Sequence, residues 1–99
     1  MKMERIDRKF KFVAVSEKSG KKYTQANAIV FLVKDALLPD LLDKYLGLCS
    51  KAGVDQRQMT GVSLLKERVL AWQRKHETKV HIPDVQIGKE ELRVCKANQ

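Results

Sequence analysis

The sequence predicts an α+β fold in which a small antiparallel sheet packs on an antiparallel two-helix hairpin, followed by an extended C-terminal tail. Three observations carry this prediction. Residues 9–15 alternate between lysine and apolar side chains at their start, residues 28–33 form an uninterrupted apolar run, and residues 36–52 and 56–76 repeat apolar side chains every three or four positions. A period of two is typical of a strand, and a period near 3.6 is typical of a helix.

The predicted sheet combines an N-terminal hairpin with the strand 28–33. The alternation places two phenylalanines on one face of residues 9–15 and two lysines on the other. Residues 16–20 are rich in turn formers and end in glycine, which favours a hairpin into residues 21–24. The run 28–33 is apolar and rich in β-branched residues, as expected of a strand covered on both faces. It also fits the first turns of a longer helix, and periodicity does not decide between the two.

The first helix is predicted over residues 36–52. Asp35 can accept hydrogen bonds from the free amides at its start, and Pro39 falls in the first turn, where no amide is required. One half of the helix is apolar and consists of Leu37, Leu38, Leu41, Leu42, Tyr45, Leu46, Leu48, Cys49 and Ala52. This half is wider than the stripe of about 100° that an ordinary surface helix buries. We therefore expect a second copy of the chain to cover part of it, giving a homo-oligomer.

The second helix is predicted over residues 56–76. Gly53 suits a left-handed cap of the preceding helix, and Asp55 with Gln58 has the spacing of a capping box. Its apolar stripe consists of Met59, Val62, Leu65, Val69 and Trp72. The expected core comprises Trp72, Leu65, Val69, Leu41, Leu42 and Tyr45. Alternating apolar residues after position 76 predict that residues 77–99 form an extended tail.

Length and composition predict a single soluble domain spanning residues 1–99, since a chain of 99 residues can build one hydrophobic core but not two. No apolar run approaches the roughly 18 residues of a membrane span, so we expect no membrane partner and a cytoplasmic protein. Cys49 and Cys95 have no paired spacing and are interpreted as free thiols. The formal charge of +8 favours anionic partners such as nucleotides, nucleic acid or acidic proteins.

No motif indicates catalysis, and the sequence predicts a protein that is not an enzyme. His76 and His81 are the histidines available as a general base, and neither lies in a recognisable catalytic pattern. A zinc site built from these histidines and the two cysteines would lack the local ligand pair typical of such sites. The glycine-rich loops that hold phosphates are absent. We therefore expect no catalytic residue, no metal and no cofactor.

The candidate ligand-binding residues are Arg57, Gly61, Arg68 and Lys75, which we call the basic row. Their spacings are close to whole helical turns, so they line up on a side of the second helix away from its apolar stripe. Arginine presents a fork of donors that matches phosphate, and glycine lets a ligand approach the backbone closely. The row predicts binding of a small phosphate-bearing ligand such as a nucleotide. A solvated helix face with a tolerated glycine is the alternative.

Residues 48–62 also match the spacing of a helix-turn-helix. Cys49 is small, a glycine follows four residues later at Gly53, and apolar residues stand at Met59 and Val62. In that motif the second helix enters the major groove of DNA. A DNA-binding regulator is therefore one alternative function, and an inhibitor that docks on a partner protein through exposed apolar surface is another.

The order of the predicted elements resembles small phage-encoded accessory proteins. A basic hairpin and an apolar strand precede Lys34 and Asp35, and a leucine-rich helix with Pro39 precedes a second helix ending in the sequence 68–73. The resemblance covers the layout of residues 8–82 and includes anti-defence sponges, of the anti-Thoeris and anti-CBASS kinds, that sequester immune signalling nucleotides. It implies a non-enzymatic oligomer with phosphate-binding pockets between its subunits. No family motif matches residue by residue, so the resemblance assigns no binding residue.

Overall fold

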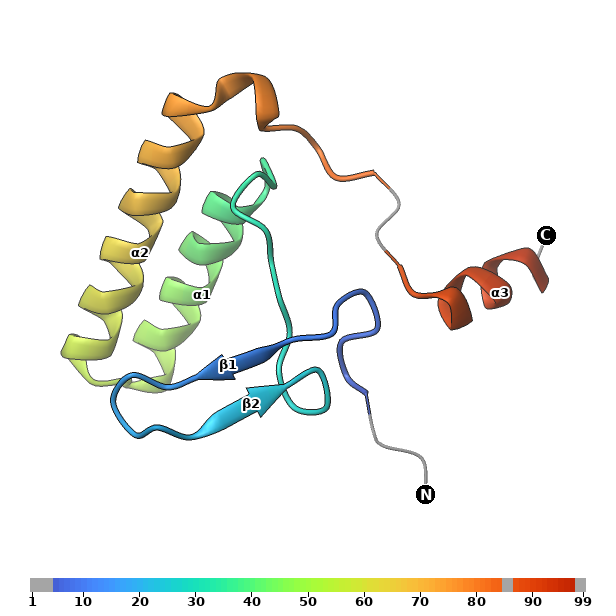
Figure 1. Cartoon of the computed structure of the whole chain (residues 1–99). Helices are drawn as coiled ribbons and strands as arrows, with labels where there is room; N and C mark the ends of the chain where they lie inside the picture. Colours follow the sequence, from blue (N-terminus) through green and yellow to red (C-terminus); the bar gives the residue numbers. More distant parts are fainter. Residues whose placement is uncertain (1–4, 85–86, 98–99) are drawn as a thin grey trace. The chain divides into compact units, whose positions relative to one another are not determined.

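The computed structural model describes residues 5–84 and 87–97 and confirms the α+β class. In chain order the elements are β1 (Val13–Val15), β2 (Lys22–Thr24), α1 (Leu38–Ala52), α2 (Gln56–Lys75), the 3₁₀ turn η1 (Glu77–Lys79) and α3 (Lys89–Ala97), as Figure 1 shows. The chain divides into two compact units. The first comprises Met1–Val30 with Asp84–Gln99, and the second comprises Phe31–Pro83. The sheet and the two long helices thus belong to different units, and packing of one on the other stays a prediction.

The N-terminal hairpin forms as expected, although its strands are short. β1 and β2 pair antiparallel, with Ala14 opposite Tyr23 in the middle of the ladder. Gly20 closes the turn in the left-handed region at φ 74°, a conformation that glycine adopts without strain. The first strand begins at Val13 instead of residue 9, because side chains capture the preceding amides. The amide of Phe10, for example, donates to the carboxylate of Asp7 and not to a neighbouring strand.

The predicted strand at residues 28–33 is wrong. Residues 28–32 have no regular secondary structure, and a turn begins at Val33. The amide of Val30 donates to Asp7 Oδ2 at 2.9 Å, so it is not available for a strand ladder. Ile29 is exposed, which also differs from the two-sided burial expected of a central strand. β-branched composition favours a strand only weakly, and here the hydrogen bond from the Val30 amide to Asp7 outweighs that preference.

Polar side chains organise the first unit. Asp7 is only 4% exposed, and its carboxylate accepts hydrogen bonds from the amides of Lys9, Phe10 and Val30. The amide of Phe10, followed by those of Val30 and Lys9, holds the pKa of Asp7 below its ordinary value of 3.8, although burial opposes the shift. Gln25 is also buried, and its backbone oxygen accepts from Asp7 itself. These two residues tie together segments that are far apart in the sequence.

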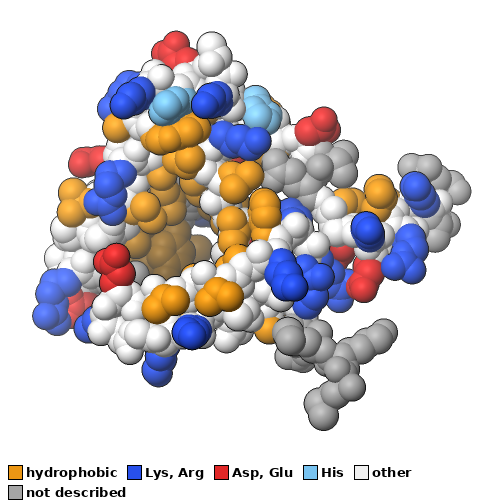
Figure 2. All heavy atoms as spheres, viewed as in Figure 1, with side chains coloured by type: hydrophobic (Ala, Val, Ile, Leu, Met, Phe, Trp, Pro, Cys, Tyr) orange, Lys and Arg blue, Asp and Glu red, His pale blue; other side chains and the backbone are white. Residues whose placement is uncertain are grey.

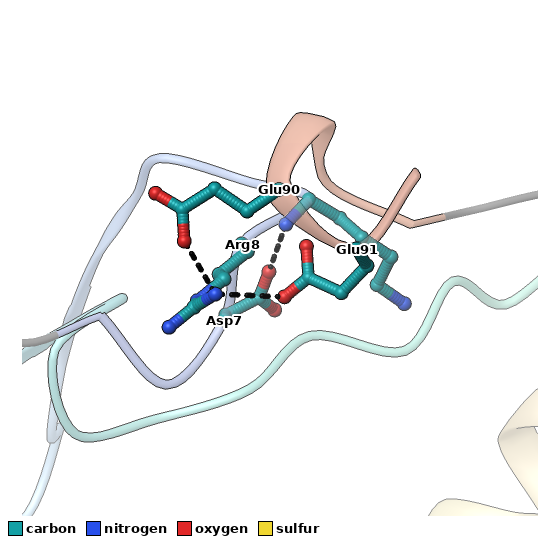
Figure 3. Close-up of polar contacts among 5 residues, drawn as sticks. Asp7, Arg8, Glu90 and Glu91 are labelled. Carbon is teal, nitrogen blue, oxygen red and sulfur yellow. Dashed lines mark hydrogen bonds and ion pairs between the residues drawn. The ribbon is translucent and has the colours of Figure 1, made fainter. Parts of the chain in front are cut away.

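The tail is not extended as predicted, because part of it is helical. Residues 77–79 form η1 and residues 89–97 form α3, while residues 85–86 and 98–99 lie outside the described part. Glutamates in the first turn and Lys96 in the last turn of α3 complement the helix dipole, a signal that outweighs the short apolar alternation. Figure 3 shows Arg8 reaching both acidic side chains at the start of α3, Glu90 and Glu91.

The predicted helical hairpin is confirmed to within a few residues at each end. Gly53 adopts the left-handed cap at φ 72°, and its amide donates back to the last turn of α1. The side chain of Asp55 accepts the amide of Arg57 and caps α2. At the start of α1, however, Leu37 occupies the cap position, and Asp35 accepts its amide from just outside the helix.

The two helices lie side by side along their length (Figure 1), and their contact forms the apolar core of the second unit. The buried apolar residues of this unit are Leu38, Pro39, Cys49, Val62 and Val69. An ion pair between Asp43 and Lys66 joins the middles of the helices at 2.6 Å. At the end of the hairpin where α1 begins and α2 ends, Gln73 Nε2 donates to the backbone oxygens of Val33 and Asp35. This side chain fastens the segment before α1 to the last turns of α2.

Half of the predicted core is exposed. Of the six expected residues Val69 is buried at 5% exposure, and Leu42 and Trp72 are half-buried. Leu41, Tyr45 and Leu65 lie on the surface of the chain, which corrects the prediction for these three. The physical reason is geometric: each helix contacts its partner over one arc, and apolar residues beside that arc have nothing in the hairpin to cover them.

The pKa of Asp7 can be tested through the amides that it accepts. In the native protein the Phe10 amide resonance should titrate with a midpoint below 3.8, because the folded state holds the carboxylate ionised. The contribution of Asp7 to stability is therefore present above the unfolded-state pKa and lost as the pH falls through the folded-state pKa. In Asp7→Asn this titration should vanish and the melting temperature should drop. Glu17→Gln, in the exposed turn, is the control, and a midpoint at or above 3.8 would contradict the assignment.

The burial pattern of α2 predicts different costs for two truncations. Val69→Ala should lower the free energy of unfolding by about 1–3 kcal/mol, because it removes buried methyl groups from the helix contact. Leu65→Ala deletes a larger side chain that is 43% exposed and should cost less. Urea denaturation of both variants makes the comparison. An equal or larger loss for Leu65→Ala would show that Leu65 is covered in solution.

Candidate anion-binding face of α2

The structure places the basic row on one exposed side of α2. At about 100° per residue, Arg57, Gly61, Arg68 and Lys75 fall within an arc of about 40°. The buried Val62 and Val69 lie about 100° further round the helix. All four members of the row are exposed. Figure 2 shows Lys and Arg side chains along the outer side of α2, beside apolar side chains gathered over the two helices.

Arg57 is already paired within the chain. Its Nε and one terminal nitrogen donate to the two carboxylate oxygens of Asp55 at 3.1 and 3.0 Å. Arg57 is the main cause of the lowered pKa of Asp55, and Asp55 in turn raises the pKa of the guanidinium. The side chain of Arg57 is 90% exposed, so this pair is weakened by water and salt. Sequence spacing did not reveal this pair, because Asp55 was assigned to capping alone.

Arg68 and Lys75 are the cations of the row that have no acidic partner among the described residues. Glu67 adjoins Arg68 in sequence, but neighbouring positions on a helix point about 100° apart. The two cations are separated by seven residues, or about 10 Å along the axis. Side chains of this length and flexibility can converge on one ligand of nucleotide size.

Arg57 lies in the first turn of α2, eleven residues before Arg68, which is about 16 Å along the helix axis. A single phosphate therefore cannot lie beside both arginines at their helix positions. Arg68 and Lys75 form the compact part of the row, and Arg57 is within range only of a longer ligand. The charge of Arg57 is also partly balanced by Asp55.

Gly61 leaves open space on this side of α2. A side-chain carbon added at Gly61 would meet no atom within 4 Å, and the same holds for Gly47 on α1. The backbone at Gly61 is therefore accessible to a ligand, while nothing in the chain itself requires glycine there. Glycine in a helix interior costs stability relative to alanine, so its presence has no folding explanation in the described structure.

A second candidate lies in the first unit, where a small pocket of about 210 Å³ opens near the start of α3. It is lined by Ile6, Asp7, Arg8, Lys9, Ile29, Ile87, Gly88 and Glu91. Its volume is below the 300 Å³ or more of typical ligand sites. The Asp7 carboxylate is occupied by three amides, and Arg8 is engaged by Glu90 and Glu91. The polar groups of this pocket thus hold the unit together.

No metal site is evident within residues 5–84 and 87–97, where no three His, Cys, Asp or Glu side chains gather suitably for an ion. Cys49 is buried and Cys95 is exposed, and both are free thiols. In the same part of the chain, every helix is too short or too polar to cross a membrane. No protein-family model matches the sequence, and neither a curated protein nor a solved structure is significantly similar to it.

The two helical glycines make a matched pair for a stability test. Gly61→Ala and Gly47→Ala should each raise the free energy of unfolding by about 0.5–1 kcal/mol, because alanine is the better helix former and neither site is crowded. Urea denaturation of the two variants measures the effect. A loss of stability in Gly61→Ala alone would mean that another part of the molecule packs against this side of α2.

Proposed function

We propose that this protein is a non-enzymatic binding protein for an anionic, phosphate-bearing ligand, which it holds on the exposed side of α2. Arg68 supplies the forked donors that match phosphate, Lys75 supplies a point charge, and Gly61 lets the ligand approach the helix backbone. The resemblance in layout to anti-defence sponges makes a signalling nucleotide our specific candidate. In such a role the protein would lower the concentration of the free nucleotide by sequestering it.

One observation carries this proposal: two cations without an ion pair to any described residue share a side of α2 with an uncrowded glycine. Among the described residues, carboxylates form ion pairs with Arg8, Arg57 and Lys66, and Arg57 is the remaining cation of the basic row. Arg68 and Lys75 have no such partner among the described residues. Their charge is therefore available to an external anion, and the total of +8 attracts such anions over longer distances.

The DNA-binding alternative has less geometric support. The helices of a helix-turn-helix cross at about 90–120°, and the second helix projects into the major groove. Here α1 and α2 lie side by side, and the Asp43 to Lys66 ion pair joins them at mid-length (Figure 1). The basic charge of α2 remains compatible with nucleic acid. Salt dependence separates the two functions, because DNA binding should weaken by about 0.9 per phosphate contact in a log-log plot.

Arg68→Ala should weaken binding of a phosphate-bearing ligand by about ten- to a hundred-fold while the melting temperature stays unchanged. Denaturing the purified protein and analysing the supernatant by mass spectrometry measures the nucleotide that it retained. The native protein should release a nucleotide, and Arg68→Ala should release much less. Gly61→Ala should also release less if the ligand contacts the backbone.

The matched control is Arg74→Ala, which removes the same side chain from the same helix. Arg74 is exposed and lies about 100° away from the basic row. The Arg74→Ala variant should retain as much nucleotide as the native protein. The proposal fails if the native protein releases none, or if both arginine variants lose it equally.

A further inference from the structure

The exposed part of the apolar half of α1 forms a continuous stripe. Leu37, Leu41, Tyr45 and Leu48, which we call the α1 stripe, are between 43% and 55% exposed. Their spacings of four, four and three residues place them within an arc of about 80°, directly beside the arc that contains the buried Leu38 and Cys49. The hairpin thus buries one part of the apolar half of α1 and leaves the adjoining part on the surface.

The α1 stripe continues onto α2. Leu65 and Trp72 lie between the buried arc of α2 and the basic row, at about 50–70° from the buried residues. When two antiparallel helices pack together, each has residues that precede its contact arc as the helix turns from its N-terminus to its C-terminus. These residues lie on the same side of the pair in both helices. The α1 stripe, these two residues and the basic row therefore share one face of the hairpin. Figure 2 shows apolar side chains over both helices on one face, with cations at the outer side of α2.

Cations border this apolar face along both of its long sides. Arg68 and Lys75 follow the α2 side. Lys44 and Lys51 line the α1 side. Around the helix axis they lie about 20–40° from Leu37, on the side of Leu37 away from the buried residues. Asp40 is the acidic residue of α1 on that border, which therefore keeps a net positive charge. An exposed apolar patch with a polar rim marks an interaction surface, and the sign of the rim selects the partner.

This charge pattern argues against a second copy of the chain on this face. A two-fold dimer brings a surface against itself, so its basic borders would face basic borders. Like charges placed together across an interface are unfavourable. The complementary surface is apolar along its middle and acidic on both sides. An amphipathic helix with flanking carboxylates has this composition, and grooves between paired helices commonly accept such helices.

We propose that this face is a docking site for an acidic amphipathic helix of a partner protein. The 15 residues of α1 span about 22 Å, which matches a partner helix of about four turns. Apolar side chains of the partner would lie on the α1 stripe and Leu65, and its carboxylates would meet Lys44 and Lys51 on one border and Arg68 and Lys75 on the other. The α1 stripe carries this inference independently of the phosphate-bearing ligand.

The test uses two synthetic 15-residue peptides measured by fluorescence anisotropy with the full chain. Both carry leucines at helical spacing, and one has glutamate flanks where the other has lysine flanks. The glutamate peptide should bind at least about ten-fold more tightly than the lysine peptide, because only its flanks complement the cationic borders. Its affinity should fall as salt is added. Equal affinities of the two peptides, or no binding of either, would overturn the proposal.

Single variants of the chain locate the site. Leu41→Ser and Leu48→Ser should each weaken the glutamate peptide by about ten-fold and keep the native melting temperature, since both side chains are exposed. A melting temperature lowered in both variants would overturn the proposal and assign the face to the sheet of the same chain. Leu92→Ser is the control: its side chain is 42% exposed, close to the 43% of Leu41, but it belongs to α3 and not to the helical hairpin. An equal loss in this control would show that binding is not confined to the proposed face.

Two further measurements exclude other occupants. A dimer detected by sedimentation and abolished by Leu48→Ser would assign the face to a second copy. Binding to phosphatidylglycerol vesicles, lost in Leu48→Ser while the peptide does not bind, would assign it to a lipid surface. Nucleotide retention should be native in Leu48→Ser, whereas Arg68→Ala should lose both ligands. Loss of the peptide without loss of nucleotide therefore separates this inference from the proposed function.

Discussion

The contact between α1 and α2 is the constraint on which the second unit depends. Two helices packed side by side bury one arc of each, and here that arc contains Leu38, Cys49, Val62 and Val69. Because α1 is apolar over about half of its circumference, the arc beside the contact stays on the surface. The same geometry that gives the hairpin its core therefore also gives it an exposed apolar stripe, and it directs the cations of α2 along the border of that stripe.

The first unit is held by a different kind of interaction. None of its described residues is a buried hydrophobic side chain, whereas Asp7 and Gln25 are both buried. A buried carboxylate stabilises a fold only when its oxygens are satisfied, and Asp7 accepts three backbone amides. Each of these bonds also removes an amide from strand pairing, which explains why β1 begins late and why the chain around Val30 is irregular. The small sheet and the loops beside it thus share one cause.

The sequence predicts elements well where local chemistry determines them. Gly53 and Asp55 end one helix and begin the next through their own backbone and side-chain preferences, and both positions are correct. Prediction from the sequence fails where a residue far away in the chain determines the local structure. At Val30, for example, the amide donates to the side chain of Asp7, 23 positions earlier. Periodicity likewise assigned Leu41 and Tyr45 to the core, because it identifies the apolar side of a helix but not whether a second surface covers it. Spacing along the helix predicts the basic row, whereas the ion pair between Asp55 and Arg57 is evident only in the structure.

The two proposed ligands draw on the same cations. Arg68 and Lys75 border the apolar face and also form the compact part of the basic row, so a helix lying on the α1 stripe would place its carboxylates where a phosphate would bind. Each ligand then lowers the affinity of the other by the same factor, as reciprocity of binding free energies requires. A protein of this design would release its nucleotide when the acidic partner docks, or hold the partner off while the nucleotide is bound. The apolar stripe distinguishes the ligands, because only the partner helix gains free energy from covering Leu41, Tyr45 and Leu48.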